Sequence, residues 1–264
     1  MASYTELLQS LERLPDSTVK AHIPGDWMQG RTTSGGLSAA LCLEAAQSIL
    51  DTSEKPIRTA QMAFVGPVSG DVSVRAQVLR AGKNTAFVRA EIMAEGAIST
   101  QAIFTFGKGR DSQLHHSAVA MPDVAAPETF PDFFRSGAGP SFARHFDVRL
   151  AYGSPPVSNT EDNEIGLWMR HADPAAPSDA TALLALGDAP PPAALSMLKT
   201  HGPVSSMTWY LDFLTTDLQT EARWFFARHT ADTAMQGYSS QSMTLWNRSG
   251  RPIVRARQMI AVFG

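Results

Sequence analysis

The chain has 264 residues, of which 44% are hydrophobic and 18% charged, and its formal net charge is −3. This is the composition of an ordinary globular protein, long enough for one large domain or two of roughly 130 residues. The slight acidic excess argues against a nucleic-acid or anionic-membrane surface, because both need a basic excess.

Cysteine and histidine usage sets further limits. Cys42 is the single cysteine, so an internal disulfide and a thiolate metal cluster are excluded. The seven histidines have no metal-ligand spacing, and we expect neither a metal nor a cofactor. No signal peptide is visible, and no stretch approaches the ~20 apolar residues of a membrane helix. We therefore expect a soluble, cytoplasmic protein that does not enter a membrane.

The first half of the chain begins with helical apolar spacing over residues 4–14, which predicts a short amphipathic helix. Residues 37–50 are apolar on nearly every face, with Glu44 and Gln47 the main interruptions, and such a helix is expected to be buried. Apolar and polar residues then alternate through three segments joined by short polar turns. This pattern predicts an antiparallel meander with strands at 71–80, 85–94 and 97–107.

Residues 108–143 lose this pattern and are rich in Pro, Ala, Ser and Gly. We interpret them as a linker with a short helix around residues 130–134. The plan of the first half then recurs. Residues 178–188 are predicted to form a short apolar helix with Ser178 or Asp179 as its N-cap. The strands predicted around it lie at 144–151, 164–171, 205–214, 221–229, 237–246 and 251–264.

The final strands of the two halves resemble each other. Aligned on their last glycine, TQAIFTFG (100–107) and RQMIAVFG (257–264) share Gln, Ile, Phe and Gly, and Gln101 matches Gln258. Because both copies end an equivalent series of elements, we interpret them as an internal duplication. The predicted organisation is an N-terminal domain at 1–107, a linker at 108–143 and a C-terminal domain at 144–264.

Five segments in a fixed order carry a resemblance to a known family. They are GRTTSGGLSAAL (30–41), residues 61–92, LLALGDAPPPAAL (183–195), SSMTWYLDFL (205–214) and RARQMIAVF (255–263). In this order they resemble the acyl-CoA thioesterase II (TesB-like) family. The resemblance implies an α+β double hot-dog fold, in which two antiparallel sheets each wrap round a buried central helix within one chain. It also implies hydrolysis of acyl-CoA to free fatty acid and CoA, an activity of fatty acid metabolism.

The family's catalytic residues fall on Asp188, Ser206 and Gln258, where Ser206 replaces the more usual Thr. Thr208 is the alternative hydroxyl, expected on the same strand face as Ser206. Asp188 sits at the unfavourable end of a helix dipole, so helix stability does not explain it. Gln258 shares its strand face with aliphatic side chains, where an amide must find partners or cost roughly 1–3 kcal/mol.

The expected mechanism is direct hydrolysis. Asp188, held by Gln258 and Ser206, would activate one water as general base. Gly35 and Gly36, which open the first buried helix, are expected to bind the substrate by donating backbone N–H groups to the oxyanion. No nucleophile elbow G-x-S-x-G is present, which argues against a covalent acyl-enzyme.

Several alternatives stay open. Glu44 and Gln101 could form a second, pseudo-symmetric site, or Glu44 could simply pair with a basic neighbour. The protein could bind acyl-CoA or acyl chains without catalysis. A hydratase would need a histidine beside one of the helix motifs, and none is found there. Met207, Trp209, Leu211 and Phe213 are interpreted as one face of a strand, either core or acyl-tunnel lining. Because a fused pair mimics the usual hot-dog dimer, we expect a homodimer or homotetramer.

Overall fold

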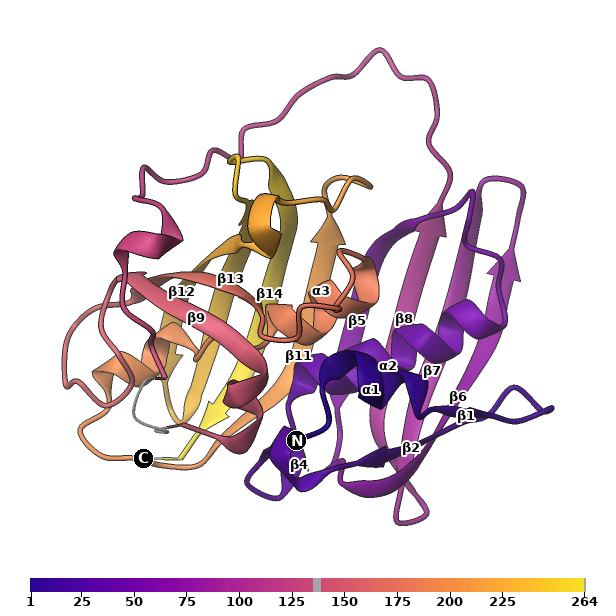
Figure 1. Ribbon diagram of the computed structural model, residues 1–264, viewed down its shortest axis with the longest axis horizontal. Helices are drawn as coiled ribbons and strands as arrows, with labels where there is room; N and C mark the ends of the chain where they lie inside the picture. The colour runs from indigo at the N-terminus through magenta and orange to yellow at the C-terminus, as the bar shows by residue number, and fades with distance from the viewer. Residues whose placement is uncertain (135–138, 264) are drawn as a thin grey trace.

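The computed structural model describes residues 1–134 and 139–263. Within these residues, twelve strands form one antiparallel sheet, and two further short strands pair with each other. The helices α2 and α3 lie on the same side of the sheet (Figure 1). Gly264, on which the two strand ends were aligned, lies outside the described residues.

The first half contributes two α-helices and eight strands to the described chain. The buried helix and the meander are found where the sequence predicts them. The elements are α1 (Tyr4–Gln9), β1 (Glu12–Arg13), β2 (Val19–Ile23), β3 (Met28–Gln29), β4 (Thr32–Thr33), α2 (Gly35–Ser48), β5 (Ile57–Phe64), β6 (Gly70–Ala81), β7 (Thr85–Ala94) and β8 (Ala97–Gly107).

The second half contributes one short α-helix and six strands to the described chain. Its helix begins at the predicted N-cap Asp179, whose side chain accepts a hydrogen bond from the Ala182 N–H. The elements are β9 (Phe146–Tyr152), β10 (Glu164–His171), α3 (Ala180–Gly187), β11 (Val204–Phe213), β12 (Phe225–Met235), β13 (Tyr238–Asn247) and β14 (Pro252–Val262).

The sheets of the two halves join edge to edge. The strand order is β1-β2-β6-β7-β8-β5-β11-β14-β13-β12-β10-β9, so the halves meet where β5 pairs with β11. This pairing runs from Thr208 opposite Ala63 to Asp212 opposite Thr59. The double hot-dog fold is thus confirmed, and its two sheets are continuous through one antiparallel strand pair.

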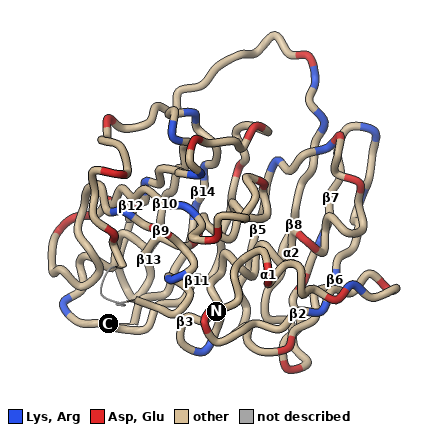
Figure 2. Tube along the Cα trace, in the orientation of Figure 1, with Lys and Arg blue, Asp and Glu red and all other residues tan. Residues whose placement is uncertain are grey.

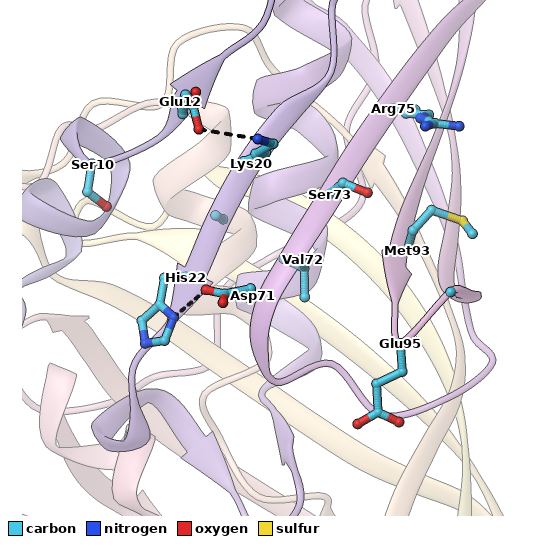
Figure 3. A pocket seen from close by; sticks show the side chains of 12 residues that line it. Ser10, Glu12, Lys20, His22, Asp71, Val72, Ser73, Arg75, Met93 and Glu95 are labelled. Carbon is cyan, nitrogen blue, oxygen red and sulfur yellow. Dashed lines mark hydrogen bonds and ion pairs between the residues drawn. The ribbon is translucent and has the colours of Figure 1, made fainter.

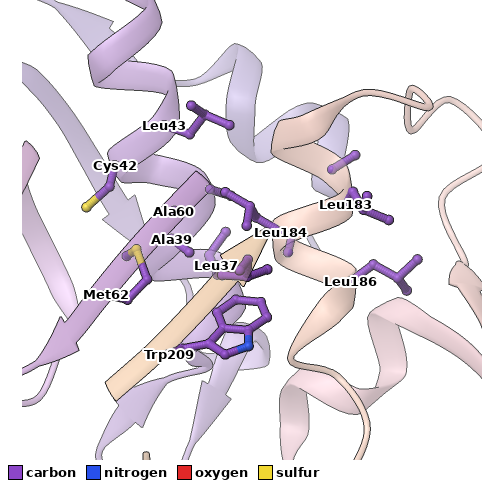
Figure 4. Packing of buried hydrophobic residues seen from close by; sticks show 14 of the residues in the cluster. Leu37, Ala39, Cys42, Leu43, Ala60, Met62, Leu183, Leu184, Leu186 and Trp209 are labelled. Carbon is purple, nitrogen blue, oxygen red and sulfur yellow. The ribbon is translucent and has the colours of Figure 1, made fainter. Parts of the chain in front are cut away.

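The helices α2 and α3 pack against each other in the apolar layer between the halves. Leu37, Leu184 and Leu186 are all at most 1% exposed, and Trp209 of β11 closes the layer from the sheet side (Figure 4). Glu44 and Gln47 are among the less buried positions of α2, as its sequence predicts. The helices come close because Gly36 has no side chain. A Cβ there would stand 2.6 Å from the Ala185 carbonyl oxygen and 2.8 Å from that of Leu184.

Residues 119–130, within the predicted linker, pack on the outer face of the second half, the face opposite α3. Trp168, Phe226 and Trp246 lie side by side across β10, β12 and β13 and are almost fully buried. The Trp168 indole N–H donates to the Ala125 carbonyl at 2.9 Å, and that of Trp246 donates to the Val119 carbonyl at 3.0 Å. These bonds satisfy two buried donors while residues 119–130 cover the aromatic row.

The structure corrects several predictions. The first helix ends at Gln9 rather than residue 14, and β1 follows. The segment at 221–229 starts as a 3₁₀ turn at Glu221–Arg223, so strand β12 begins only at Phe225. In the linker the short helix is a 3₁₀ turn at Pro127–Thr129, earlier than predicted. Strands β1 to β5 were not predicted.

Charged residues of both signs are interspersed over both halves (Figure 2). No helix in the described part of the chain is long and apolar enough to cross a membrane.

Gly36→Ala is expected to destabilise the protein, although alanine normally favours a helix by about 1 kcal/mol over glycine. The added methyl has no room against α3, and such overpacking costs about 1–3 kcal/mol. Urea unfolding measures the change. Gly25→Ala is the control because a Cβ there would meet nothing within 4 Å. A Gly36→Ala protein as stable as wild type would contradict this packing.

Candidate active site

Asp188 lies between the ends of two helices. It is the C-cap residue of α3, and Pro190 prevents the helix from continuing. Its Oδ2 accepts a hydrogen bond from the Gly36 N–H in the first turn of α2, at 3.0 Å. The carboxylate therefore faces the C-terminal end of one helix dipole and the N-terminal end of another. Since α2 has 14 residues and α3 has eight, the favourable dipole belongs to the longer helix.

Gln258 holds the other oxygen of this carboxylate. It lies on the inner face of β14 and is 5% exposed. Its Nε2 donates to Asp188 Oδ1 at 2.8 Å and to Ser206 Oγ at 2.9 Å. An ionised carboxylate only accepts hydrogen bonds, so the amide must present its NH₂ group to this side. Asp188 and Ser206 are thus the hydrogen-bond partners that the inward-facing amide of Gln258 requires.

Ser206 faces the site because β11 contains a β-bulge. Ser206 pairs with Ile260 and Thr208 with Met259, so Met207 is an extra residue in the ladder. A bulge shifts the alternation of side chains by one position. Ser206 therefore points inward with Trp209 and Leu211, while Thr208 and Met207 are exposed. The expectation that Ser206 and Thr208 share a face is wrong, and Met207 does not belong to the apolar stripe.

Burial changes the acidity of Asp188. It raises the pKa of the carboxyl from 3.8 to about 6, and hydrogen bonds from Gln258 and the backbone of Gly36 oppose part of the rise. A carboxylate with a pKa near the working pH is ionised yet basic enough to take a proton from water. The sequence places Asp188 at a helix end, but this shift arises from its surroundings.

Gln241 supports the segment that follows Asp188, and sequence reasoning missed it. It lies directly opposite Gln258 on the inner face of β13 and is fully buried. Its Oε1 accepts from the Ala193 N–H at 3.1 Å, and its Nε2 donates to Ser239 Oγ at 2.5 Å. The sequence did contain a signal for it. Gln241 lies two residues before the inward-facing Met243, so its side chain faces inward as well, and a buried amide needs hydrogen-bond partners.

Glu44 and Gln101 do not come together as a second site. The Glu44 carboxylate pairs with Arg13 at 2.9 Å, which matches the alternative of a basic neighbour. Gln101 points away from α2, because the buried residues of β8 are its neighbours Thr100 and Ala102, followed by Phe104. Gln101 therefore aligns with Gln258 in sequence but occupies the opposite face of its strand.

A separate cleft of about 620 Å³ lies at the edge of the first half (Figure 3). Two pairs lie among its charged residues: His22 with Asp71 at 2.7 Å and Lys20 with Glu12 at 3.7 Å. The lining comes from the N-terminal segment and from β1, β2, β6, β7 and the turn after β7, and includes none of the residues around Asp188.

Across residues 1–134 and 139–263, no three His, Cys, Asp or Glu side chains are grouped to hold a metal ion.

Comparison with known proteins identifies the family. The model of the acyl-CoA thioesterase N-terminal domain matches residues 23–107, and that of the acyl-CoA thioesterase C-terminal domain matches residues 120–262. Among curated proteins, no match is found.

Solved structures share the fold over the whole chain. A hot-dog protein of unknown function from Alicyclobacillus acidocaldarius is 24% identical, covers 100% of this chain and 99% of its own, and has a TM-score of 0.87. The tesB protein of Mycobacterium avium subspecies paratuberculosis is 17% identical, covers 99% of this chain and 100% of its own, and has a TM-score of 0.81. An acyl-CoA thioesterase II from Mycobacterium marinum is 17% identical, covers 98% of this chain and 97% of its own, and has a TM-score of 0.76.

The two family models together span most of the chain, in the order that the sequence motifs suggest. The chain therefore belongs to the acyl-CoA thioesterase family and is a thioester hydrolase with a double hot-dog fold.

Proposed function

We propose that the protein hydrolyses acyl-CoA to a free fatty acid and CoA, by direct attack of a water molecule that Asp188 deprotonates. The observation that carries this proposal is a single half-buried carboxylate, bound by Gln258 and Gly36 and with its pKa raised to about 6. A general base tuned in this way typically accelerates a reaction by about 10²–10⁴-fold.

The proposed reaction has two steps. Asp188 takes a proton from water while the water oxygen forms a bond to the thioester carbonyl carbon, giving a tetrahedral oxyanion. The oxyanion then collapses and the C–S bond breaks. Asp188 returns its proton to the departing CoA sulfur, so the carboxylate is regenerated. No bond between protein and acyl group is formed.

Ser206 is assigned to the developing oxyanion. Because its Oγ accepts a hydrogen bond from Gln258, its own hydrogen remains available for the reacting centre. Such a donor stabilises charge that grows during the attack. Gly35 and Gly36 were expected to do this. Since the Gly36 N–H is bound to Asp188, the proposal gives the start of α2 the role of holding the base.

We also propose a cytoplasmic homodimer or homotetramer, since one chain already contains the pair of domains from which hot-dog dimers are built. A hydratase mechanism lacks support because the hydrogen bonds that Asp188 makes within the described residues come from Gly36 and Gln258, not from a histidine.

Asp188→Asn is expected to lower kcat by about 10²–10⁴-fold, because the amide cannot take a proton from water. Release of free CoA thiol from straight-chain acyl-CoAs of increasing length is the assay. Asp212→Asn is the control, since Asp212 lies on the same sheet but bonds the Tyr210 hydroxyl on the outer face. Equal rates for wild type and Asp188→Asn would contradict the assignment. Saturable acyl-CoA binding without turnover by wild type would instead support a binding protein.

Ser206→Ala is expected to lower kcat by about 10²-fold, the effect of losing one oxyanion donor. Ser206→Thr should retain activity because the hydroxyl is kept. Thr208→Ala is the matched control, since Thr208 is exposed on the outer face. The assignment of the hydroxyl to Ser206 is refuted if Thr208→Ala is impaired and Ser206→Ala is not.

Asp188 should also make stability depend on pH. Its pKa is raised in the folded state, so the folded protein binds this proton more tightly than the unfolded chain does. The free energy of unfolding of wild type, relative to Asp188→Asn, should therefore fall by up to about 3 kcal/mol between pH 4 and pH 7. Urea titrations at several pH values measure this difference. A difference that does not change with pH would show that the carboxyl is not perturbed.

A further inference from the structure

Phe64 places an aromatic ring beside the Asp188 carboxylate. A Cβ on Gly35 would stand 2.8 Å from Phe64 Cζ and also 2.8 Å from Asp188 Oδ2. The ring edge and the carboxylate oxygen therefore lie within twice that distance of each other. Gly35 leaves the space in which the two approach, and the ring belongs to the first half whereas Asp188 belongs to the second.

The sheet register puts Phe64 on the same face as Ser206. On β5, Met62 pairs with the inward-facing Trp209, so Phe64, two residues on, also points inward. Ala63 between them is opposite the outward-facing Thr208. Ser206 faces inward from the adjacent strand β11 because of the bulge. Phe64 and Ser206 therefore border the site from neighbouring strands at the junction of the two halves.

The groups around the carboxylate divide into polar and apolar. Gly36 and Gln258 bind its two oxygens and fix its position. Phe64 offers hydrocarbon, packs against the core, and like Asp188 keeps part of its surface exposed. The ring is therefore an apolar surface next to the carboxylate that the proposed reaction assigns to the base.

We propose that Phe64 is a specificity-determining residue: its ring is the wall against which the first carbons of the acyl chain pack. This inference rests on the proposed function. The size of the ring then limits the room beside the carbonyl, which favours straight acyl chains over chains branched at the carbon next to it. One methylene of misfit in an apolar site is worth about 10–200-fold in kcat/KM.

The test is a graded series of substitutions at Phe64. Phe64→Leu and Phe64→Ala are assayed on straight acyl-CoAs and on isomers with a methyl branch next to the carbonyl. The ratio of kcat/KM for branched over straight substrates should rise in the order wild type, Leu, Ala, by about tenfold or more for Ala. A loss of stability lowers both rates and leaves this ratio unchanged. Phe87→Ala is the control, because Phe87 is a 39% exposed phenylalanine of the same half.

A second measurement separates this proposal from the proposed function. Thioethers of CoA with a 2-oxoalkyl group, straight or branched, cannot be hydrolysed, and calorimetry gives their affinities. If wild type hydrolyses acyl-CoA but neither ratio changes in folded Phe64 variants, the wall proposal is overturned and the function stands. If wild type hydrolyses no acyl-CoA, but the affinity ratio changes in Phe64→Ala, the proposed function is refuted and the wall proposal is supported. If wild type neither hydrolyses nor binds, both are overturned.

Discussion

The carboxylate of Asp188 is shared between two helices that come from opposite halves of the chain. It ends α3 and accepts a hydrogen bond from the beginning of α2. Neither half contains the whole arrangement, so the site exists only where the two domains are packed together. The packing in turn depends on Gly35 and Gly36, since a Cβ at either would collide with the carboxylate or with the backbone of α3. The glycines that open the first buried helix therefore connect the fold of one half to the proposed catalytic base of the other.

The two halves share a plan but differ along the sheet beneath the helices. One row of cross-strand neighbours runs through Gln241, Gln258 and Trp209 in the second half and continues through Met62, Ala102 and Ala90 in the first. The polar members are all in the second half. The first half retains the scaffold and supplies a helix N-terminus and the Phe64 ring. A division of this kind is what duplication followed by loss of one site would produce.

Elements with regular periodicity could be predicted from the sequence. The buried helix α2 and strands β6, β7 and β8 follow from apolar spacing alone. Strand β5 was harder to find, because a register shift between Ile57 and Thr59 leaves only Ala60, Met62 and Phe64 in regular alternation. A register shift also explains why Ser206 and Thr208 were expected on one face, since nothing in the sequence around Met207 indicates the bulge. Asp188 and Gln258 were found through their motifs. The bond between Gly36 and Asp188, 152 residues apart, required the folded chain.

The central claim is that water attacks the thioester directly, with Asp188 as base rather than nucleophile. One turnover in H₂¹⁸O with enzyme in excess over acyl-CoA tests it, followed by mass spectrometry of the fatty acid and of the peptide that contains Asp188. Direct attack predicts one ¹⁸O atom in the fatty acid and none in the peptide. Label in the Asp188 carboxyl, with unlabelled fatty acid, would mean that the carboxylate itself had formed an anhydride with the acyl group.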